Sequence, residues 1–164
     1  MLRLATAADL PAINDIYNHY VANSTTTYDE QPLSAEDRRA WFTARLPTHP
    51  VIVACLDDAQ QTVVGFGALS HFRAKHGYRF TVENSVYVRQ DQHRGGIGSA
   101  ILADLIERAQ TLGLRAVVAV IDSTQTASLA LHAKHGFKEV GRFPQIGHKF
   151  GRWLDVVFME RILN

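Results

Sequence analysis

Cysteine, long apolar runs and surplus charge are all scarce in this sequence of 164 residues. Its single cysteine, Cys55, cannot form an internal disulfide bond, and the apolar run Val51–Leu56 around it is typical of a small core residue rather than a nucleophile. No apolar run has the length needed to cross a bilayer, and Arg3 and Asp9 interrupt the segment where a signal peptide would be apolar. We therefore expect a protein of the reducing cytoplasm that is neither exported by that route nor embedded in a membrane.

The sequence also has almost no excess of one sign of charge over the other. The 17 Lys and Arg against 16 Asp and Glu leave a formal charge of +1, so the overall field gives no reason to expect nucleic acid or an anionic membrane as a partner. Any anion must be bound by a local site. Hydrophobic residues make up 46% and charged residues 20%, the composition of a folded protein, and no repeat or linker divides the chain. The sequence thus predicts a single domain over residues 1–164.

Helix-like and strand-like hydrophobic periodicity alternate along the chain, which predicts an α/β or α+β fold. The expected strands are Leu2–Ala5, Val51–Leu56, Val63–Phe72, Phe80–Arg89, Arg115–Ile121, Phe137–Arg142 and Trp153–Arg161. The expected helices follow Thr6–Asp9, run from Ser34 through Leu46, carry Ile101 to Leu112, and run from a cap at Ser123 or Thr124 to Gly136. Between these elements, Val21–Pro32 and Phe143–Arg152 are predicted as loops, and Gly65 and Gly67 predict a bend or a close backbone approach.

A glycine-rich turn, His93-Arg-Gly-Gly-Ile-Gly98, leads from the fourth expected strand into an amphipathic helix. Such a turn aims backbone N–H groups and the positive end of a helix at one point, where phosphate is the usual ligand. A P-loop is disfavoured because Ser99 and Ala100 follow Gly98 where a Lys is needed. The dinucleotide fingerprint does not match, because its third glycine is missing and the turn does not follow the first strand. An ordinary strand-to-helix connection is the alternative.

The turn resembles the pyrophosphate motif of the GCN5-related N-acetyltransferases, which reads Gln or Arg, two variable residues, Gly, one variable residue, then Gly or Ala. Here His93 stands at the first position. Five further segments look like the branch that acetylates phosphinothricin and methionine sulfone or sulfoximine: Asn14–Tyr17, Glu83–Val88, Val117–Ile121, Leu131–Phe137 and His148–Asp155.

This resemblance implies a mixed, mostly antiparallel sheet of about seven strands with about four helices, splayed between the fourth and fifth strands. It also implies a cytoplasmic enzyme, usually a homodimer, that transfers the acetyl group of acetyl-CoA directly to the α-amino group of a small amino acid in a ternary complex. A second reading is an acyl-CoA-binding sensor without turnover, and a third is an acetyltransferase of protein N-termini or lysines.

The resemblance implies an acetyl-CoA site in the fourth strand and the turn. Arg94 is expected to compensate for the charge missing at His93, and Gln125 stands where the family usually has a cofactor-contacting Asn. The residues expected at this site are Val86, Tyr87, Val88, His93, Arg94, Gly95, Gly96, Ile97, Gly98, Ser99 and Gln125.

Acetyl transfer to an amine needs the amine in its neutral form, so a base is expected. Glu83 is the candidate, directly or through a water, because it is a carboxylate in an otherwise apolar strand; a solvent-facing strand residue is the alternative. A bulge near Asn84, as seen in the superfamily, would free backbone N–H groups near Val86 for the thioester oxygen. His132 stands where many relatives carry a Tyr that protonates the leaving thiolate; a buried histidine bonded to a carbonyl is the alternative.

For the carboxylate of the substrate, Arg73 and Arg79 offer guanidinium groups that match it in two-point contact, and solvated surface arginines are the alternative. Tyr28 and Glu30 are expected to close the pocket, and Lys149 is expected to reach it across a dimer contact. The predicted pocket wall consists of Phe72, Arg73, Ala74, Arg79, Val82, Glu83 and Asn84, with Ala74 at a position where relatives often have Pro. No compact cluster of metal ligands is present in the sequence, so no metal is expected.

Overall fold

The computed structural model describes residues 1–93 and 95–164, and one mixed sheet organises them in the order β1-β2-β3-β4-β5-β7-β6. Its strands are β1 (Leu2–Leu4), β2 (Val51–Cys55), β3 (Val63–His71), β4 (Thr81–Val88), β5 (Ala116–Asp122), β6 (Lys138–Lys149) and β7 (Arg152–Ile162). The α-helices of the described residues are α1 (Leu10–Asn23), α2 (Ala35–Thr43), α3 (Ile97–Thr111) and α4 (Thr126–Lys134). Neighbouring strands are antiparallel except β4 and β5, so the predicted fold class is confirmed.

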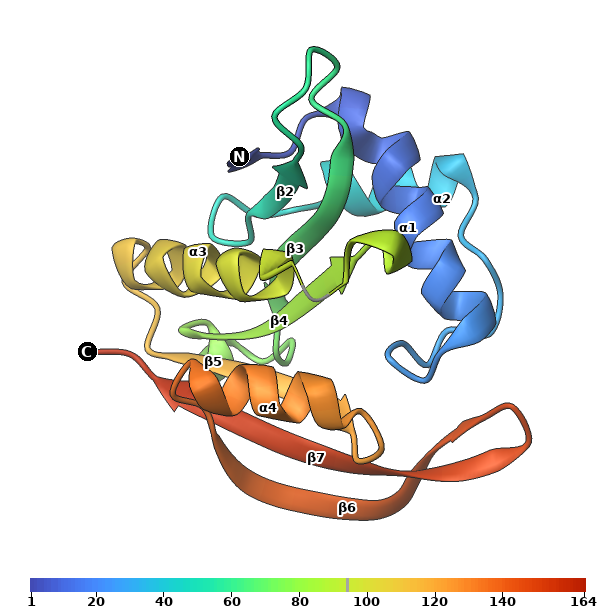
Figure 1. Ribbon diagram of the computed structural model, residues 1–164. Coiled ribbons are helices and arrows are strands. Elements are labelled where there is room, and N and C mark those ends of the chain that lie inside the picture. The colour runs from blue at the N-terminus through green and yellow to red at the C-terminus, as the bar shows by residue number, and fades with distance from the viewer. Residues whose placement is uncertain (94) are drawn as a thin grey trace.

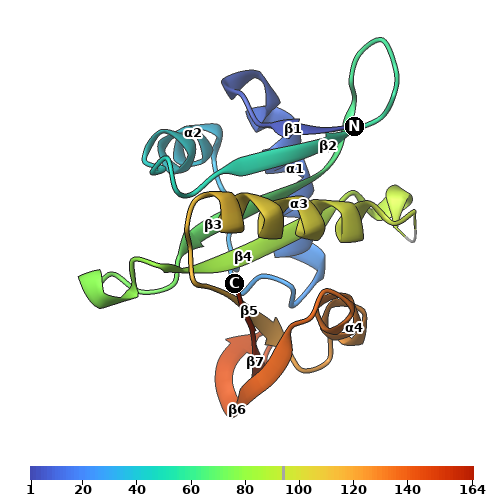
Figure 2. The same cartoon turned by 90° about the vertical axis from the view of Figure 1, so that its left-hand side faces the viewer.

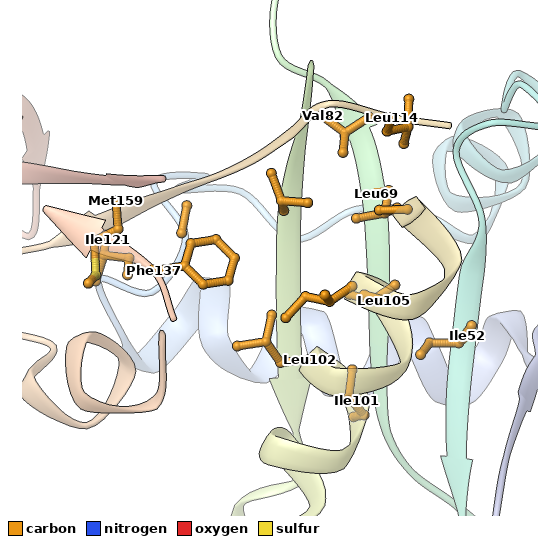
Figure 3. Packing of buried hydrophobic residues seen from close by; sticks show 14 of the residues in the cluster. Ile52, Leu69, Val82, Ile101, Leu102, Leu105, Leu114, Ile121, Phe137 and Met159 are labelled. Atoms are coloured by element: carbon orange, nitrogen blue, oxygen red, sulfur yellow. The ribbon is translucent and has the colours of Figure 1, made fainter. Parts of the chain in front are cut away.

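Helices cover both faces of the sheet (Figures 1 and 2). On one face α3 packs its apolar stripe of Ile101, Leu102 and Leu105 over Ile52 and Leu69 (Figure 3). On the other face α1 contributes Leu10, Ile13 and Ile16 to a second core around Val53, Phe66 and Tyr87. The two cores make each central strand apolar on both sides.

Gly67 allows α3 to approach β3 closely. A Cβ atom on Gly67 would lie 2.4 Å from Cγ2 of Ile101 and 2.9 Å from Cδ1 of Leu105. The close backbone approach predicted from the paired glycines is therefore confirmed.

The sheet opens between β4 and β5. The two strands pair only from Thr81 opposite Ala116 to Glu83 opposite Val118. The predicted splay is thus present, but the predicted bulge near Asn84 is wrong, because β4 pairs with β3 in one unbroken register from Val82 to Val88. The opening arises because β5 leaves β4 after three pairs while β4 stays on β3.

Several predicted boundaries differ from the structure. Helix α1 takes the first residues of the predicted loop and ends at Asn23, while α2 ends at Thr43 rather than Leu46, since Pro47 disfavours helical backbone in the residue before it. Helix α4 is preceded by Gln125 rather than capped by Ser123 or Thr124. The carboxylate of Asp122 accepts the backbone N–H and the hydroxyl of Thr124 and forms a turn there instead.

The predicted loop Phe143–Arg152 is mostly strand. Strand β6 continues to Lys149 across a register shift between Phe143 and Gly147, and β7 begins at Arg152. Only Phe150 and Gly151, both with positive φ, form the connection. In the described part of the chain, no helix is both long and apolar enough to cross a membrane.

Candidate active site

The opening between β4 and β5, beyond the pair Glu83–Val118, has two sides because side chains alternate along β4. Glu83, Ser85 and Tyr87 face α1, as the packing of Tyr87 in the core of that side shows. Val82, Asn84, Val86 and Val88 face α3 and α4. We call these the α1 side and the α3 side of the opening.

The glycine turn lies at the α3 side. Gly96 precedes α3 with φ of 79°, a left-handed conformation that suits glycine, and among the described residues no side chain caps the helix. The first helical bond runs from the N–H of Ala100 to the carbonyl of Gly96, so the N–H groups of Ile97, Gly98 and Ser99 have no partner within the helix. Because these groups and the helix dipole attract negative charge, the turn fits a diphosphate.

His93 connects this turn to α1. The hydroxyl of Tyr20 donates to the carbonyl of Val88 at 2.6 Å, and Nε2 of His93 lies 2.9 Å from Tyr20 Oη and 3.1 Å from that same carbonyl. A carbonyl only accepts, so Nε2 is the donor. Tyr20 lies in the helix predicted after Asp9, and no local signal in the sequence indicates its bond to the strand.

Other predicted cofactor residues also contact the protein itself. The side-chain amide of Gln125 donates to Oγ1 of Thr25 at 3.0 Å, and Oγ of Ser99 lies 2.7 Å from Nε2 of His135. A Cβ atom on Gly98 would be 3.6 Å from side chains of Val88 and Leu131, so the turn lies against both β4 and α4. Arg94 lies outside the described residues.

Glu83 is the half-buried carboxylate of the opening. Its neighbours across the sheet are Ser70 on β3 and Val118 on β5, and its side chain has no hydrogen-bond partner among the described residues. Burial alone raises the pKa of Glu83. A half-buried carboxylate with a raised pKa is suited to accept a proton at neutral pH.

His132 is buried and neutral. Its Nδ1 lies 2.8 Å from the carbonyl of Ser128, to which it must donate, and Nε2 accepts from Nδ2 of Asn84 at 2.9 Å. Burial, the largest influence, lowers the pKa of the ring. The neutral ring therefore carries no proton on Nε2, which does not fit the predicted acid; the alternative, a buried histidine bonded to a carbonyl, matches this geometry.

The segment Ser24–Glu30, which we call the strap, follows α1 and runs beside the β6–β7 hairpin (Figure 1). Lys149 is fully buried and donates through Nζ to the carbonyls of Ser24 and Thr27, both at 2.7 Å. Burial lowers its pKa. Lys149 thus contacts its own chain, and the expected reach across a dimer contact is wrong because its amine is used inside the fold.

The second half of the strap is held by further contacts. The hydroxyl of Tyr17 donates to Asp29 at 2.6 Å and lies 2.8 Å from Oγ1 of Thr27. The ring of Tyr28 lies against Gly147, and its buried Oη has no partner among the described residues. Burial and the charges of Asp122 and Asp155 raise the pKa of Tyr28 to about 12, so this hydroxyl remains a donor at neutral pH.

Both predicted substrate arginines are exposed in the connection between β3 and β4. The guanidinium of Arg73 lies 5.3 Å from the ring centroid of Phe72, and that of Arg79 lies 4.3 Å from the ring centroid of Phe80. The connection, which includes Ala74, starts after His71, opposite Val82, so it lies next to Glu83 along the sheet. The structure therefore brings the β3–β4 connection, which is part of the predicted pocket wall, to the paired end of the opening. The strap lies elsewhere, beside the β6–β7 hairpin.

A surface cavity of about 630 Å³ lies elsewhere, between the start of α1 and the β2–β3 turn. Arg3, Asp9, Asp15 and Arg89 are among its lining residues, and none of the predicted site residues that the structure describes lines it. Two of its charges are already paired, Arg3 with Asp9 at 2.7 Å. Geometry thus favours the opening over this cavity as the site.

Comparison with known proteins identifies the family of the chain. A family model described as "Acetyltransferase (GNAT) domain" matches residues 2–158. The L-methionine sulfoximine/L-methionine sulfone acetyltransferase of Pseudomonas aeruginosa is 46% identical over 99% of this chain and 94% of that protein.

Two solved structures are similar over nearly the whole chain. A phosphinothricin acetyltransferase from Sinorhizobium meliloti in complex with acetyl-CoA has a TM-score of 0.95 and 39% identity, covering 100% of this chain and 88% of that one. A ribosomal-protein-alanine N-acetyltransferase from Brucella melitensis has a TM-score of 0.94 and 41% identity, covering 99% of both chains.

Proposed function

Since the chain belongs to the GNAT acetyltransferase family, we propose that it acetylates the α-amino group of small amino acids of the methionine sulfone, methionine sulfoximine or phosphinothricin type. The acetyl group comes from acetyl-CoA and passes directly to the amine in a ternary complex. The observation that carries this proposal is that the glycine turn and the half-buried carboxylate of Glu83 belong to one opening: Glu83 lies at its paired end on the α1 side, and the turn follows β4 on the α3 side.

In this proposal acetyl-CoA lies along the α3 side of the opening. The backbone N–H groups from Gly95 to Ser99 hold its diphosphate, and Arg94 adds positive charge. The pantetheine arm lies along Val86, Tyr87 and Val88, whose backbone on that edge has no strand partner. The bonds of His93 and Gln125 within the protein support a role in positioning the turn and the strap.

Glu83 accepts the proton of the substrate ammonium, directly or through a water. An amine with a pKa of about 7.7 to 10.4 costs roughly 1 to 5 kcal/mol to deprotonate at pH 7, so a base contributes substantially. The nitrogen lone pair then attacks the thioester carbon, and the carbon–sulfur bond breaks to release the CoA thiolate. With a thiol pKa of about 8.5, an unprotonated thiolate costs only about 2 kcal/mol, so water protonates it and His132 is not needed as an acid.

The amino acid acceptor lies on the α1 side. Arg73 and Arg79 bind its carboxylate, and Phe72, Ala74 and Val82 belong to the surrounding wall. Tyr28 and Glu30 of the strap close the far end, where the Tyr28 hydroxyl donates to an oxidised sulfur or phosphorus oxygen.

A spectrophotometric assay of CoA release tests the function. We expect saturable turnover with methionine sulfone, methionine sulfoximine or phosphinothricin and none with a peptide beginning with alanine. Turnover only on the peptide would favour a protein N-acetyltransferase, which the similarity to the Brucella melitensis enzyme makes the specific alternative. CoA binding without turnover on any acceptor would favour the sensor.

We also propose that the protein forms a homodimer through the β6–β7 hairpin. Strand β6 is a sheet edge, and Phe143, Ile146, Phe150 and Trp153 on this hairpin are all about half exposed or more. Light scattering is expected to give twice the chain mass for the native protein and the single-chain mass for Trp153→Glu. An unchanged mass in the variant would contradict this interface.

A further inference from the structure

Asn84 is a buried polar residue with unused bonding capacity. Its side chain lies on β4 directly after Glu83, the last residue that pairs with β5, and only 7% of the residue is exposed. Its Oδ1 has no hydrogen-bond partner among the described residues. Buried carbonyl oxygens of this kind nearly always have a donor, so this atom points to a ligand that supplies one.

The orientation of this amide is fixed by His132. Because Nδ1 of His132 donates to the carbonyl of Ser128, its Nε2 must accept, and Asn84 must turn its NH₂ group toward the ring. The ring is held in place by edge contact with Phe137, with centroids 5.0 Å apart. Oδ1 of Asn84 is consequently left on the side away from His132, as an acceptor only.

The surroundings restrict what the donor can be. Asn84 faces the α3 side, next to the apolar side chains of Val82 and Val86, and Leu69 lies opposite it on β3. A charged donor would lose its solvation here without a countercharge. A neutral N–H is the chemistry that this position fits.

We propose that Oδ1 of Asn84 accepts a hydrogen bond from the pantetheine amide N–H nearest the sulfur, and that His132 is the positioning residue that aims it. This inference rests on the proposed use of acetyl-CoA. With the thioester beside Glu83 and the diphosphate at the turn after Val88, the arm runs along β4, where each residue advances about 3.3 Å. The first amide, two carbons from the sulfur, then lies level with the residue after Glu83.

Calorimetry with CoA and with an analogue in which an ester oxygen replaces that N–H tests the contact directly. We expect the native protein to bind the analogue about tenfold more weakly than CoA, since the analogue leaves a buried acceptor unpaired. In Asn84→Ala the two ligands should bind equally, whereas Asn23→Ala, an exposed asparagine on α1, should keep the tenfold preference. Equal binding by the native protein, or a preference retained in Asn84→Ala, would overturn the proposal.

The role of His132 has its own readout. We expect His132→Leu to lose most of the preference for CoA over the ester analogue while the pH profile of kcat keeps its shape. A profile whose alkaline limb shifts in His132→Leu would restore the acid role and contradict positioning. The calorimetric measurements with CoA and its ester analogue need no acceptor. A failure to acetylate any amino acid would therefore refute the proposed substrates but would leave the result of the calorimetry unchanged.

Discussion

Glu83→Gln is expected to lower kcat about 100-fold at pH 7 and much less near pH 10. Proton removal by a positioned base typically contributes this much, and at high pH the amine loses its proton unaided. The measurement is a pH–rate profile with methionine sulfone at saturating acetyl-CoA. An equal loss at every pH would refute the base assignment.

The same substitution is expected to stabilise the fold at pH 7. Burial raises the pKa of Glu83 in the folded state above its ordinary value, so ionising it costs more in the folded chain than in the unfolded chain. This penalty is absent below the ordinary pKa and is complete above the folded pKa. Thermal unfolding should therefore show a higher Tm for Glu83→Gln at pH 7 but not near pH 4, and Glu107→Gln, an exposed position on α3, should change neither.

Lys149→Met should cost about 2–4 kcal/mol of unfolding free energy, because it leaves the buried carbonyls of Ser24 and Thr27 without a donor. For a chain of this size that corresponds to a Tm lowered by about 5–15 °C. Lys138→Met, an exposed lysine at the start of the same strand, is the matched control. A Tm equal to that of the control would contradict the role of Lys149 in holding the strap.

Gly147→Ala tests whether the strap contacts the amino acid acceptor. A Cβ atom there would lie 2.3 Å from the ring of Tyr28, so the ring must move, whereas a Cβ atom on Gly141 meets nothing within 4 Å. We expect KM for the amino acid to rise about tenfold in Gly147→Ala with the KM for acetyl-CoA unchanged. Equal effects on both constants, or none, would argue against a strap that contacts the acceptor.

Local pattern was sufficient for most of the fold. Continuous apolar runs such as Val51–Cys55 and helical spacing such as Ile101, Leu102 and Leu105 are properties of neighbouring residues, so they predict elements well. The loop predicted over Phe143–Arg152 is wrong because Pro144 and Gly147, although their residue types are typical of turns, lie here in a register shift of an edge strand.

In the candidate site, too, some features follow from local sequence and others depend on residues far apart in the chain. The glycine turn and Glu83 were recognisable because each depends on a strand and the residues beside it. The bond between Asn84 and His132 joins residues 48 apart, and the contacts of Lys149 join residues 122 and 125 apart, so no periodicity predicts them. Buried polar pairs of this kind depend on the packing of whole layers rather than on sequence spacing.

The short pairing of β4 with β5, only three residue pairs long, also has a consequence for folding stability in the presence and absence of acetyl-CoA. Past that pairing the described residues of β5 form no amide ladder with β4, and in our proposal the extended arm of acetyl-CoA takes that place. A ligand present at 100 times its Kd adds about 2.7 kcal/mol to folding free energy. If acetyl-CoA binds as proposed, we expect the protein to resist heat and proteolysis better with acetyl-CoA bound than without it.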